Sequence, residues 1–240
     1  MSRLPKAPLI EVIFELRWTL SGKELQDAQY LHGDLYPKLK DKFPFREIVQ
    51  SGIPVEFAMQ LPTHRFRSDA GGYPLVQVGA GILTVNTTDP KYFWGEYENL
   101  ILEVLENFYS VYSFPPSKKV TTVLQYIDFL KFDFKNDDII KFLDENLNLS
   151  VSQTFYKSDS GAKNMTLVLH FENALGLLVF TLGSGKNSGG QDGIIIQTSI
   201  TRNNSESDTG SIKDWLDEAH KLCSNMFKDM TRGKLYSTFE

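Results

Sequence analysis

The predicted fold depends on a junction between a helix and a strand, which lies in residues 88–134, TDPKYFWGEYENLILEVLENFYSVYSFPPSKKVTTVLQYIDFLKFDF. From Phe93 to Tyr112, apolar residues recur at helical spacing and glutamates fill the opposite face, which predicts an amphipathic helix. Phe114-Pro115-Pro116 follows, and a long strand is predicted from Val120 to the end of the stretch. After this junction the chain repeats the order of elements that precedes it.

The residues before the junction predict a strand, a helix, several short strands and the amphipathic helix. Ile10–Trp18 alternates as a strand does, and Ser21 with Glu24 forms a capping box that begins a helix. We expect Pro37 to kink or split that helix and Pro44 to end it. Short strands are predicted over residues 55–61, 64–67, 73–78 and 81–87, and Asp89-Pro90 should start the amphipathic helix.

The residues after the junction predict the same series of elements. Asn136 or Asp137 should begin a short helix, and four strands are then predicted over residues 149–157, 164–171, 175–182 and 193–202. A polar loop over residues 203–210 precedes the last helix. Ser211 should cap that helix, with Asp214 at the capping-box position, and Gly233 should end it.

Each half therefore has the element order β-α-β4-α, with residues 1–117 as the first half and 118–240 as the second half of one compact unit. The halves share element order only, because their sequence identity is negligible. This order resembles the duplicated layout of the TATA-box-binding-protein-like fold. The resemblance implies an α+β fold in which both halves share one curved antiparallel sheet with helices on one face. Two tandem ferredoxin-like units, with fewer strands in each half, are the alternative.

Charge and cysteine content narrow the classes of function. The net charge is −5. Residues 1–117 carry 11 basic and 14 acidic side chains and residues 118–240 carry 14 and 16, so a nucleic-acid surface would have to be a local patch. Cys223 is the single cysteine, which excludes an intramolecular disulfide and favours a reducing compartment. With no signal-peptide pattern and no apolar run of about 20 residues, we expect a cytoplasmic protein that does not enter a membrane.

Several short motifs resemble a sporadically distributed family of uncharacterised bacterial proteins of similar length. The motifs are Leu4–Glu15, Tyr73–Gln77, Asp89 with Tyr92 and Trp94, and Leu124-Gln125-Tyr126-Ile127-Asp128. Family members usually have Asn at the position of Asp128. The resemblance implies no activity, because none is established for the family. Its patchy occurrence resembles that of accessory and defence-associated genes.

The glycine-rich segment Gly183-Ser184-Gly185-Lys186 shares only part of a phosphate-binding loop. Such a loop reads G-x-x-x-x-G-K-[ST] and leads into a helix. Here Phe180 occupies the first glycine position, Asn187 follows Lys186, and a strand is predicted next. The pattern predicts a flexible hairpin loop, for which contact with a protein partner is a better hypothesis than nucleotide binding. No cofactor is predicted.

The histidines indicate neither a metal site nor a clear catalytic group. They are scattered, without H-E-x-x-H spacing, so no metal is predicted. His170 and Glu172 share one face of a predicted strand and are candidates for an acid–base pair. Such pairs more often form the solvated face of a sheet. Cys223 lies in the apolar stripe of the last helix, where a buried thiol is inert.

Basic and aromatic residues alternate in one predicted strand. Arg65, Phe66 and Arg67 have a spacing that can stack bases and contact phosphates, and Lys118-Lys119 adds charge before the long strand. The alternative is structural, because charged side chains near a sheet edge also prevent aggregation. These residues are the candidates for binding nucleic acid.

The leading functional hypothesis is a non-enzymatic binding or adaptor protein, in which a large antiparallel sheet docks a protein partner. An accessory role in a bacterial defence-type system fits the resemblance. The alternatives are a nucleic-acid-binding module that uses the concave sheet face, and an enzyme of unknown chemistry. The sequence leaves the oligomeric state open, with a homodimer among the options.

Overall fold

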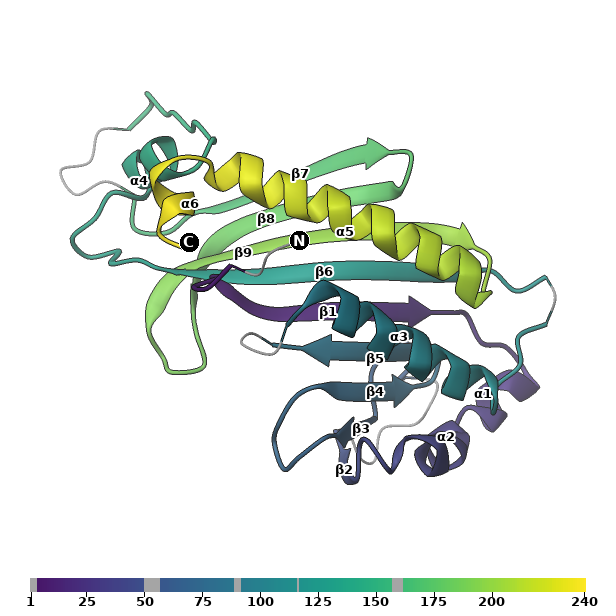
Figure 1. Cartoon of the computed structure of the whole chain (residues 1–240). Helices are drawn as coiled ribbons and strands as arrows, with labels where there is room; N and C mark the ends of the chain where they lie inside the picture. Colours follow the sequence, from purple (N-terminus) through teal and green to yellow (C-terminus); the bar gives the residue numbers. More distant parts are fainter. Residues whose placement is uncertain (1–3, 50–56, 89–91, 116, 157–161) are drawn as a thin grey trace. The chain divides into compact units, whose positions relative to one another are not determined.

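A computed structural model describes all residues of the chain except 1–3, 50–56, 89–91, 116 and 157–161. The fold is α+β, as predicted: nine strands form one antiparallel sheet in the order β2-β3-β4-β5-β1-β6-β9-β8-β7, and the described residues also form six helices (Figure 1). None of these helices combines the length and the hydrophobicity that a membrane span requires.

The chain divides into two compact units, which are described separately. Residues 11–124 and 201–217 form the unit called here the β4–β5 unit, and residues 1–10, 125–200 and 218–240 form the β7–β8 unit. Three strands and the longest helix contribute residues to both units, namely β1 (Leu9–Arg17), β6 (Val120–Lys131), β9 (Asp192–Ser205) and α5 (Thr209–Thr231).

The helices of the β4–β5 unit cover the apolar face of its strands. Besides part of β1, the unit contains α1 (Lys23–Asp27), α2 (Leu31–Leu39), β2 (Phe45–Ile48), β3 (His64–Arg67), β4 (Leu75–Gly79), β5 (Ile82–Thr87) and α3 (Trp94–Tyr109). Phe14 lies opposite Val85, and the Tyr97 hydroxyl of α3 donates to the Val85 carbonyl at 2.7 Å. On α2, the Tyr36 ring stacks on Phe66 with centroids 5.8 Å apart. Alternation along each strand therefore directs one set of side chains to the helices.

The prediction of a single helix from Ser21 to Pro44 is wrong in detail, because the structure has two helices here, α1 and α2. Glu24 accepts a hydrogen bond from the Ser21 backbone N–H at 3.1 Å, as in a capping box, but α1 ends after five residues. Backbone bonds from residue i to i−3 tighten the chain between α1 and α2. Pro37 does not split α2, which continues to Leu39 because its leucine stripe is buried.

The strand predicted over residues 55–61 is not found in its described part, because residues 57–61 form turns and bends. The fourth strand is instead β2, which pairs antiparallel with β3. Its four residues are too few to give a clear alternation, so the sequence did not reveal it. Asp89-Pro90 lies outside the described residues, and α3 begins at Trp94 with Phe93 as its N-cap.

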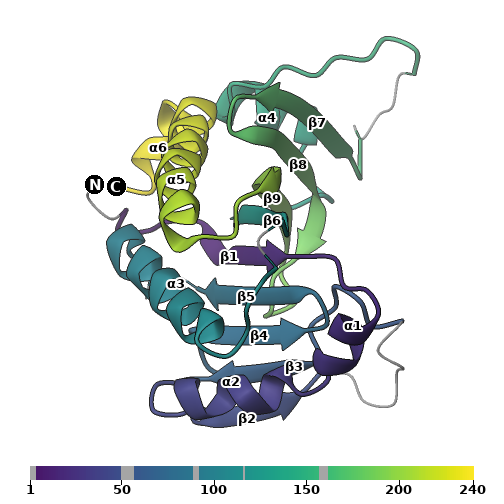
Figure 2. The same ribbon diagram turned by 90° about the vertical axis from the view of Figure 1, so that its right-hand side faces the viewer.

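The β7–β8 unit packs a hairpin and three helices around its own core. It contains α4 (Ile139–Asn146), β7 (Thr166–Asn173), β8 (Gly176–Lys186) and α6 (Lys234–Ser237), together with the larger part of β6, β9 and α5. The core includes Leu130, Phe132, Leu143, Phe180 and Ile196. Figure 2 shows β7 and β8 as one extended hairpin.

Four details of the second half differ from the prediction. Residues 149–156 form no strand, and the backbone N–H of Asn148 bonds to the Met230 carbonyl at 2.7 Å, which ties this segment to the end of α5. Asp138, rather than Asn136 or Asp137, caps α4. Asp208 accepts from the Ser211 N–H at 2.8 Å and takes the capping position expected of Ser211. Residues 203–205, predicted as loop, belong to β9.

The backbone of β6 approaches β9 closely at Gly193. A Cβ atom at this position would lie 2.4 Å from Cζ of Phe129 and 2.5 Å from the carbonyl oxygen of Leu130. Backbone atoms cannot move aside as a flexible side chain can, so only glycine fits here. The glycine is thus required for packing.

We predict that Gly193→Ala lowers the free energy of unfolding by about 1–3 kcal/mol, because the added methyl group overpacks the contact. Urea denaturation of the two chains measures the difference. Gly183→Ala is the matched control on β8, since its Cβ would meet no atom closer than 3.5 Å. Equal losses for the two variants would contradict this account of Gly193.

Candidate functional site

The side chains of the β4–β5 unit that point away from Phe14 and Phe66 form what we call the polar face. Strand register aligns them in rows across the sheet. One row runs Glu47, Arg65, Gln77, Thr84 and Glu15, each residue lying opposite the next on the neighbouring strand. A row of this composition offers carboxylates, a guanidinium, an amide and a hydroxyl on one surface.

The hydrogen bonds run from strand to strand along this row as far as Thr84 and then along β5 to Asn86. Arg65 Nε donates to Gln77 Oε1 at 2.6 Å, and Gln77 Nε2 donates to Thr84 Oγ1 at 3.1 Å. The Thr84 hydroxyl in turn donates to Asn86 Oδ1 at 2.7 Å. Each group is therefore oriented by its neighbour, which fixes its donor and acceptor directions.

Glu11 ends this chain of hydrogen bonds on β1. Its Oε1 accepts from Asn86 Nδ2 at 2.8 Å and from the Tyr73 hydroxyl at 3.4 Å. Burial, and next the nearby Glu11 carboxylate, raise the pKa of Tyr73. The phenol therefore stays protonated and remains a donor near neutral pH.

The centre of the polar face is buried although it is polar. Gln77, Thr84 and Asn86 are only 9%, 2% and 4% exposed. Buried polar atoms are costly unless they are hydrogen-bonded, and the network meets that requirement. Arg65 and Glu11 are less buried, so they form an accessible rim around a fixed centre.

Arg67 occupies a second row of the same face. Its Nε donates to Glu47 at 2.9 Å and its Nη1 to the Gly72 carbonyl at 2.9 Å, while its guanidinium lies 5.7 Å from the centre of the Tyr73 ring. The charged groups of this face thus have both signs, and Arg67 is paired with Glu47, whereas Arg65 and Glu11 bond to uncharged side chains.

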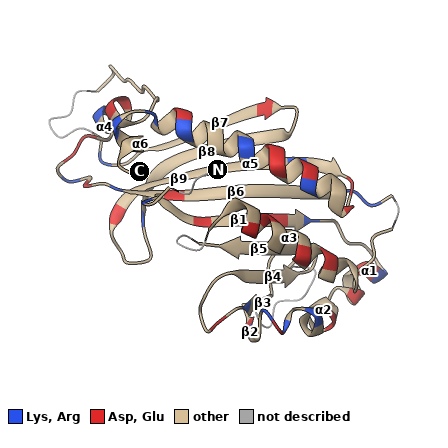
Figure 3. Ribbon diagram, viewed as in Figure 1, with Lys and Arg blue, Asp and Glu red and all other residues tan. Residues whose placement is uncertain are grey.

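The structure does not bring together the residues proposed for nucleic acid. Phe66 is 1% exposed and packs under α2, on the opposite face from Arg65 and Arg67, so its ring is not accessible to a base. Lys118 Nζ lies 3.0 Å from Glu24, and Lys119 forms an ion pair with Glu206. Figure 3 shows only acidic residues among the charged positions of α3 and residues of both signs along α5.

The glycine-rich segment is a hairpin and not a separate loop. Gly183 and Gly185 lie within β8, and Lys186 Nζ forms an ion pair with Asp192 at 2.8 Å. The Asn187 side chain then accepts from the backbone N–H groups of residues 189 and 191 and closes the turn. These contacts explain Asn187 by turn geometry, whereas Gly185 lies within β8, where a Cβ atom would come 2.3 Å from Cδ1 of Ile195.

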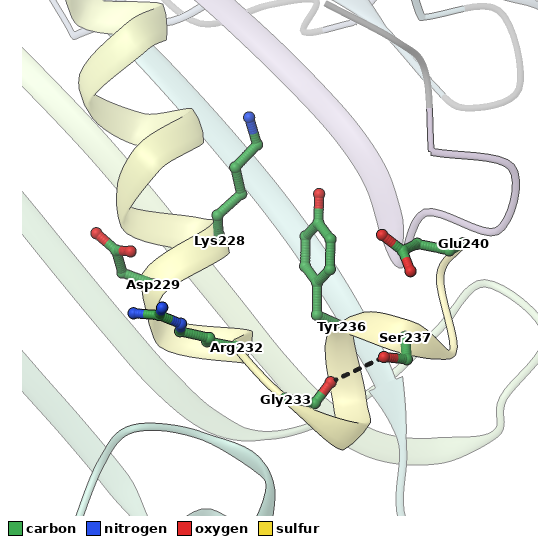
Figure 4. A pocket seen from close by; sticks show the side chains of 7 residues that line it. All are labelled: Lys228, Asp229, Arg232, Gly233, Tyr236, Ser237 and Glu240. Atoms are coloured by element: carbon green, nitrogen blue, oxygen red, sulfur yellow. Dashed lines mark hydrogen bonds between the residues drawn. The ribbon is translucent and has the colours of Figure 1, made fainter.

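The remaining polar groups show no assembled reaction site. His170 and Glu172 are exposed on β7, and in the described part of the chain no hydrogen bond joins them. Over the same described ranges, no three His, Cys, Asp or Glu side chains are placed to hold a metal ion. A hollow of about 360 Å³ is lined by Lys228, Asp229, Arg232, Gly233, Tyr236, Ser237 and Glu240. Figure 4 shows Arg232 directed away from Tyr236.

Sequence reasoning named Asp128 only as part of a family motif and missed that its carboxyl group on β6 is buried. Burial raises its pKa to about 7. Alternation along β6 places Asp128 on the same face as the buried Leu124 and Leu130, and this was the signal available in the sequence. Nearby in the same unit, the Tyr126 hydroxyl lies 2.7 Å from Nδ1 of His220. Cys223 is buried as predicted, which raises the pKa of its thiol to about 12.

No protein-family model, curated protein or solved structure matches this chain.

Asp128 should make stability depend on pH. The folded state holds the carboxyl proton more tightly than the unfolded chain, so the stabilisation is complete below pH about 4 and is lost as the pH rises through about 7. A shift of about three pKa units corresponds to about 4 kcal/mol. We expect the stability of Asp128→Asn relative to the original chain to rise by up to that amount between pH 4 and pH 8, measured by urea denaturation.

The exposed Asp214→Asn on α5 is the control, with an expected difference that stays nearly constant over this range. If the Asp128→Asn difference is equally independent of pH, Asp128 is not held protonated by burial.

Proposed function

We propose that the protein is a non-enzymatic binding or adaptor protein whose polar face docks a protein partner. The observation that supports this proposal is the continuous network from Arg65 to Glu11, in which buried amide and hydroxyl groups have fixed directions. A surface with pre-oriented groups loses little conformational entropy when a partner binds. Its rim residues would contact the partner and its buried centre would keep them in position.

The charge of the polar face favours a protein over a nucleic acid. Affinity for nucleic acid comes mainly from unpaired Lys and Arg side chains that neutralise phosphates. Here Arg67 pairs with Glu47, and Arg17 Nε lies 2.7 Å from Glu15. Paired charges of both signs suit the polar rim of a protein–protein interface. The alternative of a nucleic-acid-binding module therefore has less support.

The strand order supports the predicted duplication, which we keep as a proposal. From the middle of the sheet, one side runs β1, β5, β4, β3, β2 and the other runs β6, β9, β8, β7. Each half therefore places its first strand in the chain nearest the middle of the sheet and its last strand beside that one. The remaining strands of the half follow outward in reverse chain order. We infer that the second half follows the layout of the first with one strand fewer.

The sequence motifs support a proposed biological setting for this activity. The chain would be a member of the sporadically distributed bacterial family that it resembles, and it would act in the cytoplasm as an accessory component of a defence-type system. The adaptor hypothesis fits such a role, because accessory proteins commonly act through protein contacts.

We predict that Arg65→Ala abolishes recovery of a stoichiometric, nuclease-resistant protein partner when the tagged chain is purified from its native host. Arg65 lies on the rim of the polar face, so its loss removes a contact and leaves the apolar core intact. Arg46→Ala is the matched control, because Arg46 stacks on Tyr36 at 4.2 Å on the other face of the same sheet. It should retain the partner.

Loss of the partner from both variants, or from neither, would rule out the polar face as the docking surface. Recovery of nucleic acid alone would favour the alternative function. Circular dichroism of both variants shows whether the fold is kept.

A further inference from the structure

The two ends of the sheet differ in how well they are protected from pairing with another strand. At one end, β2 has four residues, and two of them are the charged Arg46 and Glu47. At the other end, β7 has eight residues, TLVLHFEN, with Glu172 as its only acidic or strongly basic side chain. Figure 3 shows β7 without charge along most of its length. Short, charged edges resist pairing, and long apolar edges invite it.

Two large apolar side chains of β7 are exposed. Val168 is 48% exposed and Phe171 is 46% exposed. In the described part of the chain, the sheet order ends at β7, so the outer backbone groups of this strand have no ladder partner. Both observations point to an interaction along this edge.

We propose that β7 pairs antiparallel with β7 of a second copy of this chain, joining two sheets across a two-fold axis at Leu169. The inference is independent of the polar face, which lies in the other unit.

Self-complementarity of the β7 sequence identifies the second copy as the partner. A two-fold axis perpendicular to the sheet at Leu169 places Leu169 opposite its own copy and Leu167 opposite Phe171. These apolar residues lie on the face that joins the core of the unit. On the other face, Val168 lies opposite His170 and Thr166 opposite Glu172. No like charges face each other, and apolar cross-strand pairs stabilise a sheet.

The neighbouring register is less favourable. An axis at His170 places His170 opposite its own copy and Val168 opposite Glu172. It therefore pairs two groups that can both become charged and sets an apolar side chain against a carboxylate. The axis at Leu169 avoids both contacts.

Cysteine cross-linking of the full-length chain tests this register. Leu169→Cys places two thiols directly opposite each other, with Cα atoms about 5 Å apart, which a disulfide can bridge. We expect a covalent dimer under mild oxidation. Leu167→Cys is the matched control on the same face, because its two copies would be more than about 13 Å apart. The native Cys223 is buried and should not react.

Sedimentation equilibrium of the chain without added cysteine tests the dimer itself. We expect a dimer that dissociates on dilution, and Val168→Lys should weaken it by about tenfold or more, because lysine at an edge opposes strand pairing. Val168→Thr keeps a β-branched side chain without charge and should dimerise as the original chain does. Ile48→Lys on the opposite edge strand should also have no effect.

A chain that remains monomeric at the highest attainable concentration overturns the proposal. So does a dimer that Val168→Lys leaves unchanged, or cross-linking through His170→Cys but not through Leu169→Cys.

Discussion

The alternation of β5 is the constraint on which the β4–β5 unit depends. Every residue of this strand is buried, yet Leu83 and Val85 face the helices while Thr84 and Asn86 face the other way. Successive residues of a strand point to opposite faces, so one short sequence must satisfy an apolar core and a polar network at once. The helices meet the first requirement by covering the apolar side chains. The hydrogen bonds that Gln77 donates to Thr84 and that Asn86 donates to Glu11 meet the second requirement.

The polar network connects the fold to the proposed function. A sheet face with buried amides that lack hydrogen-bond partners would destabilise the fold, and an exposed face of leucines would promote non-specific association. A hydrogen-bonded network on a rigid sheet avoids both problems and leaves accessible rim groups such as Arg65 in fixed positions. These properties suit selective contact with another protein. The edge strand β7 carries a different kind of surface, in which backbone groups and apolar side chains dominate.

The sequence predicted the helices and strands that have a long hydrophobic periodicity. It missed the elements whose structure depends on contacts with residues far away in the chain. The amphipathic helix ending near Tyr109 and the alternating strands β1 and β6 follow from local periodicity. The break before Leu31 and the short strand β2 do not, because packing against α3 and pairing with β3 decide them. Arg65 was singled out for its charge, but its partner Gln77 was not. Their contact depends on strand register, which one sequence does not reveal.

The central claim is that the polar face is held in one arrangement before any partner binds. A double-mutant cycle between Asn86 and Glu11, with each residue replaced by alanine and stability measured by urea denaturation, tests it most directly. Their 2.8 Å contact predicts a coupling free energy of about 1.5–3 kcal/mol, as expected for a hydrogen bond to a charged group. Additive effects, with no measurable coupling, would contradict a preformed network.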